Sequence, residues 1–99
     1  MQRAATLAAL AALGVPLVSD EIYDGLVFDG GRAPSALAAS DDVFVLDGFS
    51  KRYAMTGFRL GFAIVPAAAL RPLQVMQQNL FISANHFVQR AGVAALEHG

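Results

Sequence analysis

Apolar positions along the chain fall into short runs that turn-forming residues separate. Three stretches with helix-forming composition or helical spacing of apolar residues predict helices at 3–13, 67–80 and 84–97. Gly14 and Pro16 predict the end of the first helix, and Pro66 predicts the start of the second. Three continuous apolar runs predict buried strands at 16–20, 43–46 and 58–65. Glycine and proline turn signals between residues 24 and 40 predict a loop.

The order helix, strand, loop, strand, strand, helix, helix is that of an α/β protein. Strands with continuous rather than alternating apolar residues favour a sheet that is covered on both faces. The chain supplies too few strands to complete such a sheet. It is also unusually apolar, because 56% of its 99 residues are hydrophobic and only 15% are charged, against about 25% charged in an ordinary domain. We therefore expect a chain that is incomplete or obligately associated with a partner.

Composition argues against several classes of function. The net charge is −1 without a basic cluster, so nucleic acid is not expected as a partner. No metal site is expected, because the chain has no cysteine and because His86 and His98 lack a partner at metal-ligand spacing. Residues 1–18 resemble a weak secretory signal, although an Ala-rich helix followed by a strand is the favoured interpretation. No apolar stretch is long enough to span a membrane, and we expect a cytoplasmic protein.

Polar residues stand where the apolar runs end, which is where open α/β sheets build their sites. They are Asp20 and Tyr23 after the first run, Ser50 and Lys51 after the second, and Arg59 between two glycines. A lysine beside apolar residues can be partly neutral through desolvation, which suits Schiff-base chemistry with an aldehyde. An arginine near a hydroxyl and glycines suits a phosphate. A carboxylate can hold a ring nitrogen protonated and a phenol can bond a ring oxygen, so together these groups point to pyridoxal phosphate (PLP).

Two segments carry a family resemblance. Ser-Asp-Glu-Ile-Tyr, followed by Gly-Phe-Ser-Lys-Arg-Tyr-Ala-Met-Thr-Gly-Phe-Arg-Leu-Gly-Phe, resembles the class I/II aminotransferases of PLP fold type I. The resemblance covers nearly the whole chain and implies that residues 1–99 are a fragment of the PLP-binding large domain. That domain is a three-layer α/β/α structure with a mostly parallel sheet, which this chain would hold only in part. One departure is Gly48, because some relatives have a second serine there, two residues before Ser50.

The resemblance implies a role for each matching residue. Lys51, the only lysine in the chain, would hold the cofactor through a Schiff base and move a proton at the substrate α-carbon. Asp20 would pair with the pyridine nitrogen, and Tyr23 would bond the phenolic oxygen of the ring. Ser50 and Arg59 would hold the phosphate.

The implied reaction moves an amino group between an amino acid and a 2-oxo acid, and the full-length enzyme would be a homodimer. A PLP-dependent lyase of the same fold stays open as an alternative. Another is the PLP-sensing aminotransferase-like domain of a transcriptional regulator, although such domains usually have Pro-Gly where this chain has Thr56 and Gly57. A third is an inactive, truncated remnant. Because complete relatives are several times as long, we expect the chain alone to lack transaminase activity.

Overall fold

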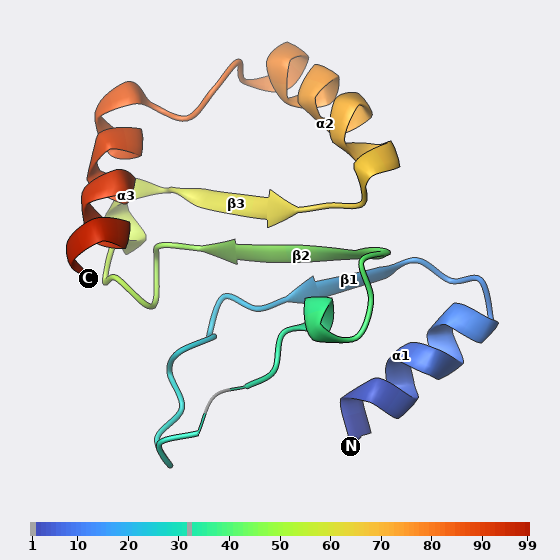
Figure 1. Cartoon of the computed structure of the whole chain (residues 1–99). Helices are drawn as coiled ribbons and strands as arrows, with labels where there is room; N and C mark the ends of the chain where they lie inside the picture. Colours follow the sequence, from blue (N-terminus) through green and yellow to red (C-terminus); the bar gives the residue numbers. More distant parts are fainter. Residues whose placement is uncertain (1, 32) are drawn as a thin grey trace.

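The residues that the structure describes form three helices and three strands in the order that the sequence predicts (Figure 1). The computed structural model describes residues 2–31 and 33–99, except for the side chains of residues 2–4 and 11. The elements are α1 (Gln2–Ala12), β1 (Leu17–Asp20), β2 (Val43–Gly48), β3 (Gly61–Ile64), α2 (Ala67–Leu80) and α3 (His86–His98), with short 3-10 turns η1 (Ala36–Ala38) and η2 (Thr56–Phe58).

The three strands form one mixed sheet in the order β1-β2-β3. Strand β1 runs parallel to β2, with Asp20 opposite Leu46, and β3 runs antiparallel to β2, with Gly61 opposite Gly48. The α/β class is confirmed, and within this chain the sheet has one parallel and one antiparallel pair. The carboxyl ends of β1 and β2 therefore share one edge of the sheet with the amino end of β3 (Figure 1).

Local backbone chemistry sets the ends of the helices. Gly14 follows α1 with a φ of 64°, a left-handed conformation that terminates helices and that glycine adopts readily. Pro66 precedes α2, where the absence of its N–H costs nothing. The side chain of Asn85 caps α3 by accepting a hydrogen bond from the Phe87 N–H at 3.2 Å.

The third strand is shorter than the apolar run from 58 to 65 predicts. Phe58 ends the 3-10 turn η2, and Arg59 adopts a left-handed conformation with φ 55° and ψ 44°. The extended backbone of β3 therefore begins only at Gly61.

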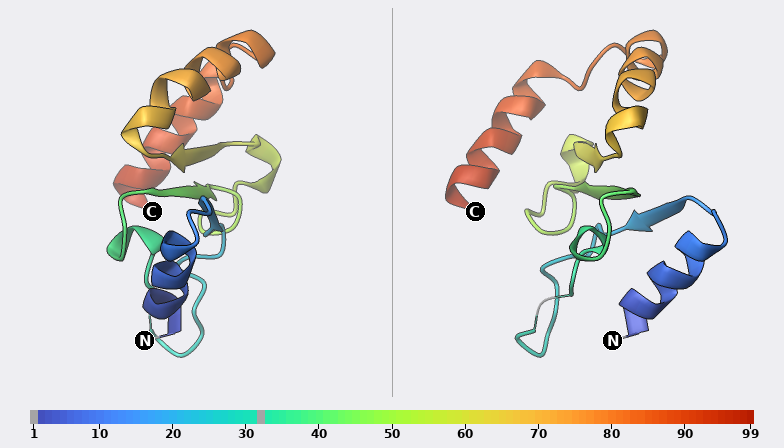
Figure 2. Two further views of the ribbon diagram at one scale, coloured as in Figure 1. Left: turned by 90° about the vertical axis from the view of Figure 1, so that its right-hand side faces the viewer. Right: turned by 45° about the vertical axis from the view of Figure 1, so that its right-hand side comes forward.

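The described residues enclose a small core and leave most apolar surface uncovered. The core lies against one side of β2 and consists of Ala36, Val43 and Val45, with Leu7, Leu17 and Leu37 packed against it. All four residues of β3 are exposed, and α2, which the structure describes in full, buries none of its residues. Figures 1 and 2 place α1 on the β1 side of the sheet and α2 and α3 on the β3 side.

The open shape agrees with this burial pattern. The Cα radius of gyration is 15.3 Å, whereas a compact domain of similar length has about 13 Å. The accessible surface is 7459 Å², against roughly 5,400 Å² for a compact protein of this mass. The exposed apolar surface confirms the expectation that this chain alone does not complete the layers of an α/β domain.

Candidate functional site

Two segments meet at the edge of the sheet where β1 and β2 end. The first follows β1 and is called the tyrosine turn (residues 21–27). The second connects β2 to β3 and is called the lysine loop (residues 49–60). Sites of α/β proteins are built at such strand ends, because loops from neighbouring strands converge there on a rigid support.

The lysine loop is closed at its base and anchored by Phe49. The Phe49 N–H donates to the Leu60 carbonyl at 3.1 Å, and the Phe49 carbonyl accepts from the N–H groups of Tyr53 and Met55 at 3.3 and 3.2 Å. Its ring is 6% exposed and lies 5.4 Å from the Tyr53 ring and 6.1 Å from the Phe62 ring. One residue thus fixes both the backbone and the interior of the loop.

Glycines let neighbouring elements approach this loop. A Cβ on Gly92 of α3 would lie 2.5 Å from Leu60 Cδ2 and 3.4 Å from Phe49 Cζ, so the helix backbone packs directly on the loop. At the loop base, a Cβ on Gly48 would lie 3.0 Å from the Leu60 carbonyl oxygen, and one on Gly61 would lie 3.1 Å from that of Asp47. Gly48, at the position where some relatives have a serine, therefore lies at a close contact between the two strands.

Ser50 and Arg59 are linked through Thr56. The Thr56 hydroxyl donates to the Ser50 carbonyl at 2.8 Å, and the Arg59 guanidinium donates to the Thr56 carbonyl at 3.0 Å. The hydroxyl and the cation that the sequence assigns to a phosphate therefore lie on one closed loop. Arg59 is exposed and Ser50 is half-buried.

Lys51 and Tyr23 face each other across the two segments. The Lys51 ammonium lies 5.7 Å from the centre of the Tyr23 ring, a distance typical of a cation–π contact. The next residue, Arg52, lies against Gly25, where a Cβ would be 3.5 Å from Arg52 Cδ. Lys51 is exposed and Tyr23 is 64% exposed. Lys51 is therefore more exposed in this chain than the sequence-based expectation of a lysine beside apolar residues implies.

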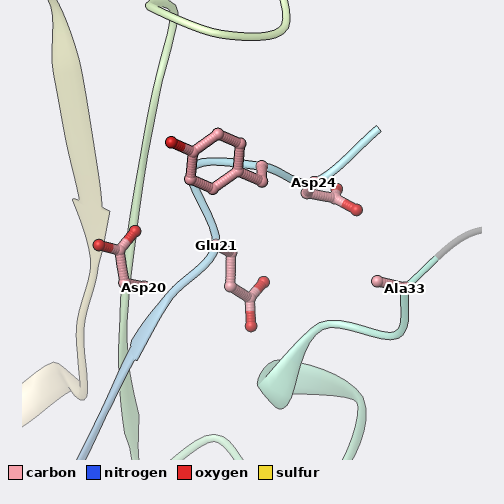
Figure 3. Close-up of a pocket in the computed structure, with 5 residues that line it drawn as sticks. Asp20, Glu21, Asp24 and Ala33 are labelled. Carbon is pink, nitrogen blue, oxygen red and sulfur yellow. The ribbon is translucent and has the colours of Figure 1, made fainter. Parts of the chain in front are cut away.

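Asp20 ends β1 and shares a small hollow with Tyr23. The hollow has a volume of about 140 Å³ and is lined by Asp20, Glu21, Tyr23, Asp24 and Ala33 (Figure 3). The exposed Asp20 carboxylate accepts a hydrogen bond from the Ile22 N–H at 3.2 Å. Lys51, Ser50 and Arg59 do not line the hollow. The structure thus joins Asp20 with Tyr23, Tyr23 with Lys51, and Ser50 with Arg59.

Sequence reasoning missed two residues that hold these segments. The Arg52 side chain packs against Gly25 of the tyrosine turn, and the only sequence signal for it is its place beside Lys51. Glu21 is not expected to form an acid/base pair with Asp20, because adjacent strand residues point to opposite faces, and Figure 3 shows the two side chains on opposite sides of the chain. The alternation is confirmed, but the Glu21 carboxylate accepts a hydrogen bond from the Ala36 N–H of a distant segment.

Comparison with known proteins identifies the class to which this arrangement belongs. The chain matches the family model for aminotransferase class I and II over residues 3–99. The chain belongs to this family, whose members are generally PLP-dependent transferases.

Curated relatives of similar sequence are named aminotransferases or transaminases. The aspartate aminotransferase of Thermococcus kodakarensis is 44% identical over 85% of this chain. The (5-formylfuran-3-yl)methyl phosphate transaminase of Methanocaldococcus jannaschii is 42% identical over 82% of it. The chain spans 22% of the length of each relative. These names do not favour the lyase or regulator alternatives.

Solved structures confirm the fold. An aminotransferase from Mycobacterium tuberculosis matches 94% of the chain with a TM-score of 0.88 and 39% identity. The aspartate aminotransferase from Thermotoga maritima matches 98% with a TM-score of 0.89 and 28% identity. The chain covers 26% of each of these structures. Among the residues that the structure describes, no helix is both long and apolar enough to cross a membrane.

Proposed function

We propose that residues 1–99 form the cofactor-anchoring part of the large domain of a PLP-dependent aminotransferase. The observation that carries the proposal is the contact of Lys51 with the Tyr23 ring at 5.7 Å, at the edge where β1 and β2 end. This contact brings the primary amine of the lysine loop to the phenol of the tyrosine turn, which follows a different strand. Such a juxtaposition suits a ligand that has an aldehyde next to a ring hydroxyl.

The full set of side chains fits PLP by its chemistry. The lysine loop carries a hydroxyl and a guanidinium on linked residues, which is a donor set for a phosphate. The opposite segment carries the Asp20 carboxylate, which suits a protonated ring nitrogen. PLP, when bound, supplies an electron sink for the charge that develops at the substrate α-carbon.

Each residue then has one task. Lys51 would bind the cofactor aldehyde through its amine and, once released, hold or deliver a proton at the substrate α-carbon. Asp20 would keep the ring nitrogen protonated, and Tyr23 would orient the ring through its phenolic oxygen. Ser50 and Arg59 would fix the phosphate and so prevent the ring from rotating out of the site.

The substrates would be an amino acid and a 2-oxo acid, and the full-length enzyme would act as a cytoplasmic homodimer. The chain alone would not transaminate. Its site edge is open to solvent, with Lys51 exposed and Tyr23 64% exposed, and an aminotransferase must exclude water from its reacting groups.

Cofactor trapping on the chain tests the proposal. The chain is incubated with PLP and reduced with borohydride, and the labelled peptide is mapped by mass spectrometry. Lys51 is the only lysine, so the α-amino group is its sole rival for the label. We expect labelling at Lys51 at low PLP concentration. It should fall about tenfold in Asp20→Ala and Arg59→Ala, because each removes a charge-assisted bond.

Matched variants separate local from general effects. Asp41→Ala and Arg90→Ala remove the same charges from exposed positions outside the two segments, and both should label like the wild type. Labelling that is weak and equal in all five proteins, or confined to the N-terminus, would overturn the proposal for this chain.

A further inference from the structure

Glu21 connects the end of β1 with β2, with the tyrosine turn and with η1. Its N–H donates to the Leu46 carbonyl of β2 at 2.8 Å, which extends the β1–β2 pairing by one residue. Its carbonyl accepts from the Asp24 N–H at 2.7 Å and closes the turn that contains Tyr23. The backbone of Glu21 is therefore fixed between the strand and the turn.

The Glu21 carboxylate reaches a third element. One oxygen, Oε1, accepts from the Ser19 hydroxyl at 2.9 Å and from the Ala36 N–H at 2.8 Å. Ala36 begins η1, is 3% exposed and belongs to the core cluster on β2. A half-buried carboxylate thus ties the end of β1 to the best-packed part of the molecule across 15 residues of sequence.

Glu21 lies between Asp20 and Tyr23 in the sequence, so its hydrogen bonds affect the positions of both residues. Asp20 and Glu21 point to opposite sides of the chain (Figure 3), so Glu21 can set the backbone at Asp20 through hydrogen bonds that Asp20 does not share. Tyr23 lies inside the turn that the Glu21 carbonyl closes, and its ring is mostly exposed.

We propose that Glu21 is a positioning residue, whose carboxylate, held by Ala36 and Ser19, sets Asp20 and Tyr23 in the geometry that lets Lys51 capture PLP. The proposal rests on the proposed function. Glu21 takes no proton from substrate or cofactor. Its effect is exerted through its two neighbours.

The test compares apparent Kd values for PLP, measured by borohydride labelling of Lys51. Glu21→Ala removes both acceptor bonds and should raise the apparent Kd about tenfold. Glu21→Gln keeps an acceptor oxygen and should stay within about twofold of the wild type. The chain has one other glutamate, Glu97, which is exposed near the end of α3. Glu97→Ala is the matched control and should change nothing.

A second variant breaks the same bond from its other end. Ala36→Pro removes the N–H donor at the first position of η1, where proline is compatible with a helical turn. Ser35 before it has φ −63° and ψ 152°, a conformation that a following proline favours. Ala36→Pro should raise the apparent Kd as Glu21→Ala does.

The outcomes separate the two proposals. A wild-type chain that is not labelled at Lys51 overturns the proposed function. A labelled wild type with Glu21→Ala at the same apparent Kd overturns the positioning role alone. So does a Glu21→Gln variant that is as weak as Glu21→Ala, or an Ala36→Pro variant that binds like the wild type. Circular dichroism of each variant reports whether it folds. If Glu21→Ala does not fold, a folded Ala36→Pro variant with weak labelling of Lys51 supports the proposal, and one that is labelled like the wild type overturns it.

Discussion

The lysine loop and the tyrosine turn lie at the same edge of the sheet, yet they are held in different ways. The lysine loop is closed on itself by backbone hydrogen bonds and filled by Phe49, which is 6% exposed. No residue of the tyrosine turn is fully buried, and Phe28, the residue after it, lies entirely in solvent at 103% exposure. One half of the site is a self-supporting unit, and the other depends on Glu21 and on contacts with its neighbour.

This difference suggests that the two segments would have different roles in anchoring PLP. The groups assigned to the phosphate and the aldehyde lie on the rigid half, so they can be in place before the cofactor arrives. The groups assigned to the ring lie on the half with fewer supports, which can adjust to the ring once the phosphate is held. Truncating a side chain should therefore reduce stability and PLP labelling most in the lysine loop, and least in the exposed segment after the tyrosine turn.

The largest effect is expected from Phe49→Ala. Removing a buried aromatic ring from a packed site costs about 3–5 kcal/mol of stability, and here it also releases the support under Lys51. Urea unfolding should show the loss, and PLP labelling of Lys51 should fall with it. Hydrogen exchange at the Tyr53 and Met55 amides, both bonded to the Phe49 carbonyl, should become fast. Unchanged exchange at these amides would contradict the account of the loop.

An intermediate effect is expected from Gly25→Ala in the tyrosine turn. Gly25 has a φ of 85°, and a left-handed conformation costs an alanine roughly 1–2 kcal/mol. The added Cβ meets Arg52 only at an ordinary contact distance of 3.5 Å, so the cost comes from the backbone. Exchange should quicken at the Asp24 and Leu26 amides and not in the lysine loop.

Gly57→Ala is the control for this variant. Gly57 has no positive φ, and a Cβ there would meet nothing within 4 Å. It should leave stability and exchange unchanged. An equal loss in both glycine variants would show that backbone conformation is not the cause.

The smallest effect is expected from Phe28→Ala. Its side chain is fully exposed, and substitutions of this kind change stability by less than about 0.5 kcal/mol. The variant makes the same deletion as Phe49→Ala, so the two urea midpoints compare the halves directly. A loss in Phe28→Ala that matched the loss in Phe49→Ala would remove the distinction between them.

The elements were largely predictable because their signals are local. The helix from 67 to 80 matches α2 in full, since Pro66 marks its start and helix-forming residues fill it. The third strand was predicted too long, because Phe58 and Leu60 are as apolar as β3 itself. A 3-10 turn and the left-handed Arg59 stand before the strand, and a pattern of apolar residues does not report either of them.

The convergence of the candidate site's residues at one end of the sheet was predictable, and the contacts that support these residues were not. Asp20, Tyr23, Ser50, Lys51 and Arg59 fall at strand ends, and the parallel pairing of β1 with β2 brings their segments to one edge. The bond between Glu21 and Ala36 spans 15 residues, and no local spacing encodes it. The exposure of Lys51 also could not be read from the sequence, because it depends on what covers the loop.

The antiparallel direction of β3 has a consequence for the order in which the molecule assembles. A parallel third strand would need a crossover connection of a dozen residues or more, and its amino end would lie at the opposite edge, away from Lys51. Because β3 returns directly from β2, a single hairpin delivers Ser50, Lys51 and Arg59 together. Contacts that are close in sequence form faster than distant ones. We therefore expect the phosphate and aldehyde anchors to form first during folding, and Asp20 and Tyr23 to join them when β1 pairs with β2.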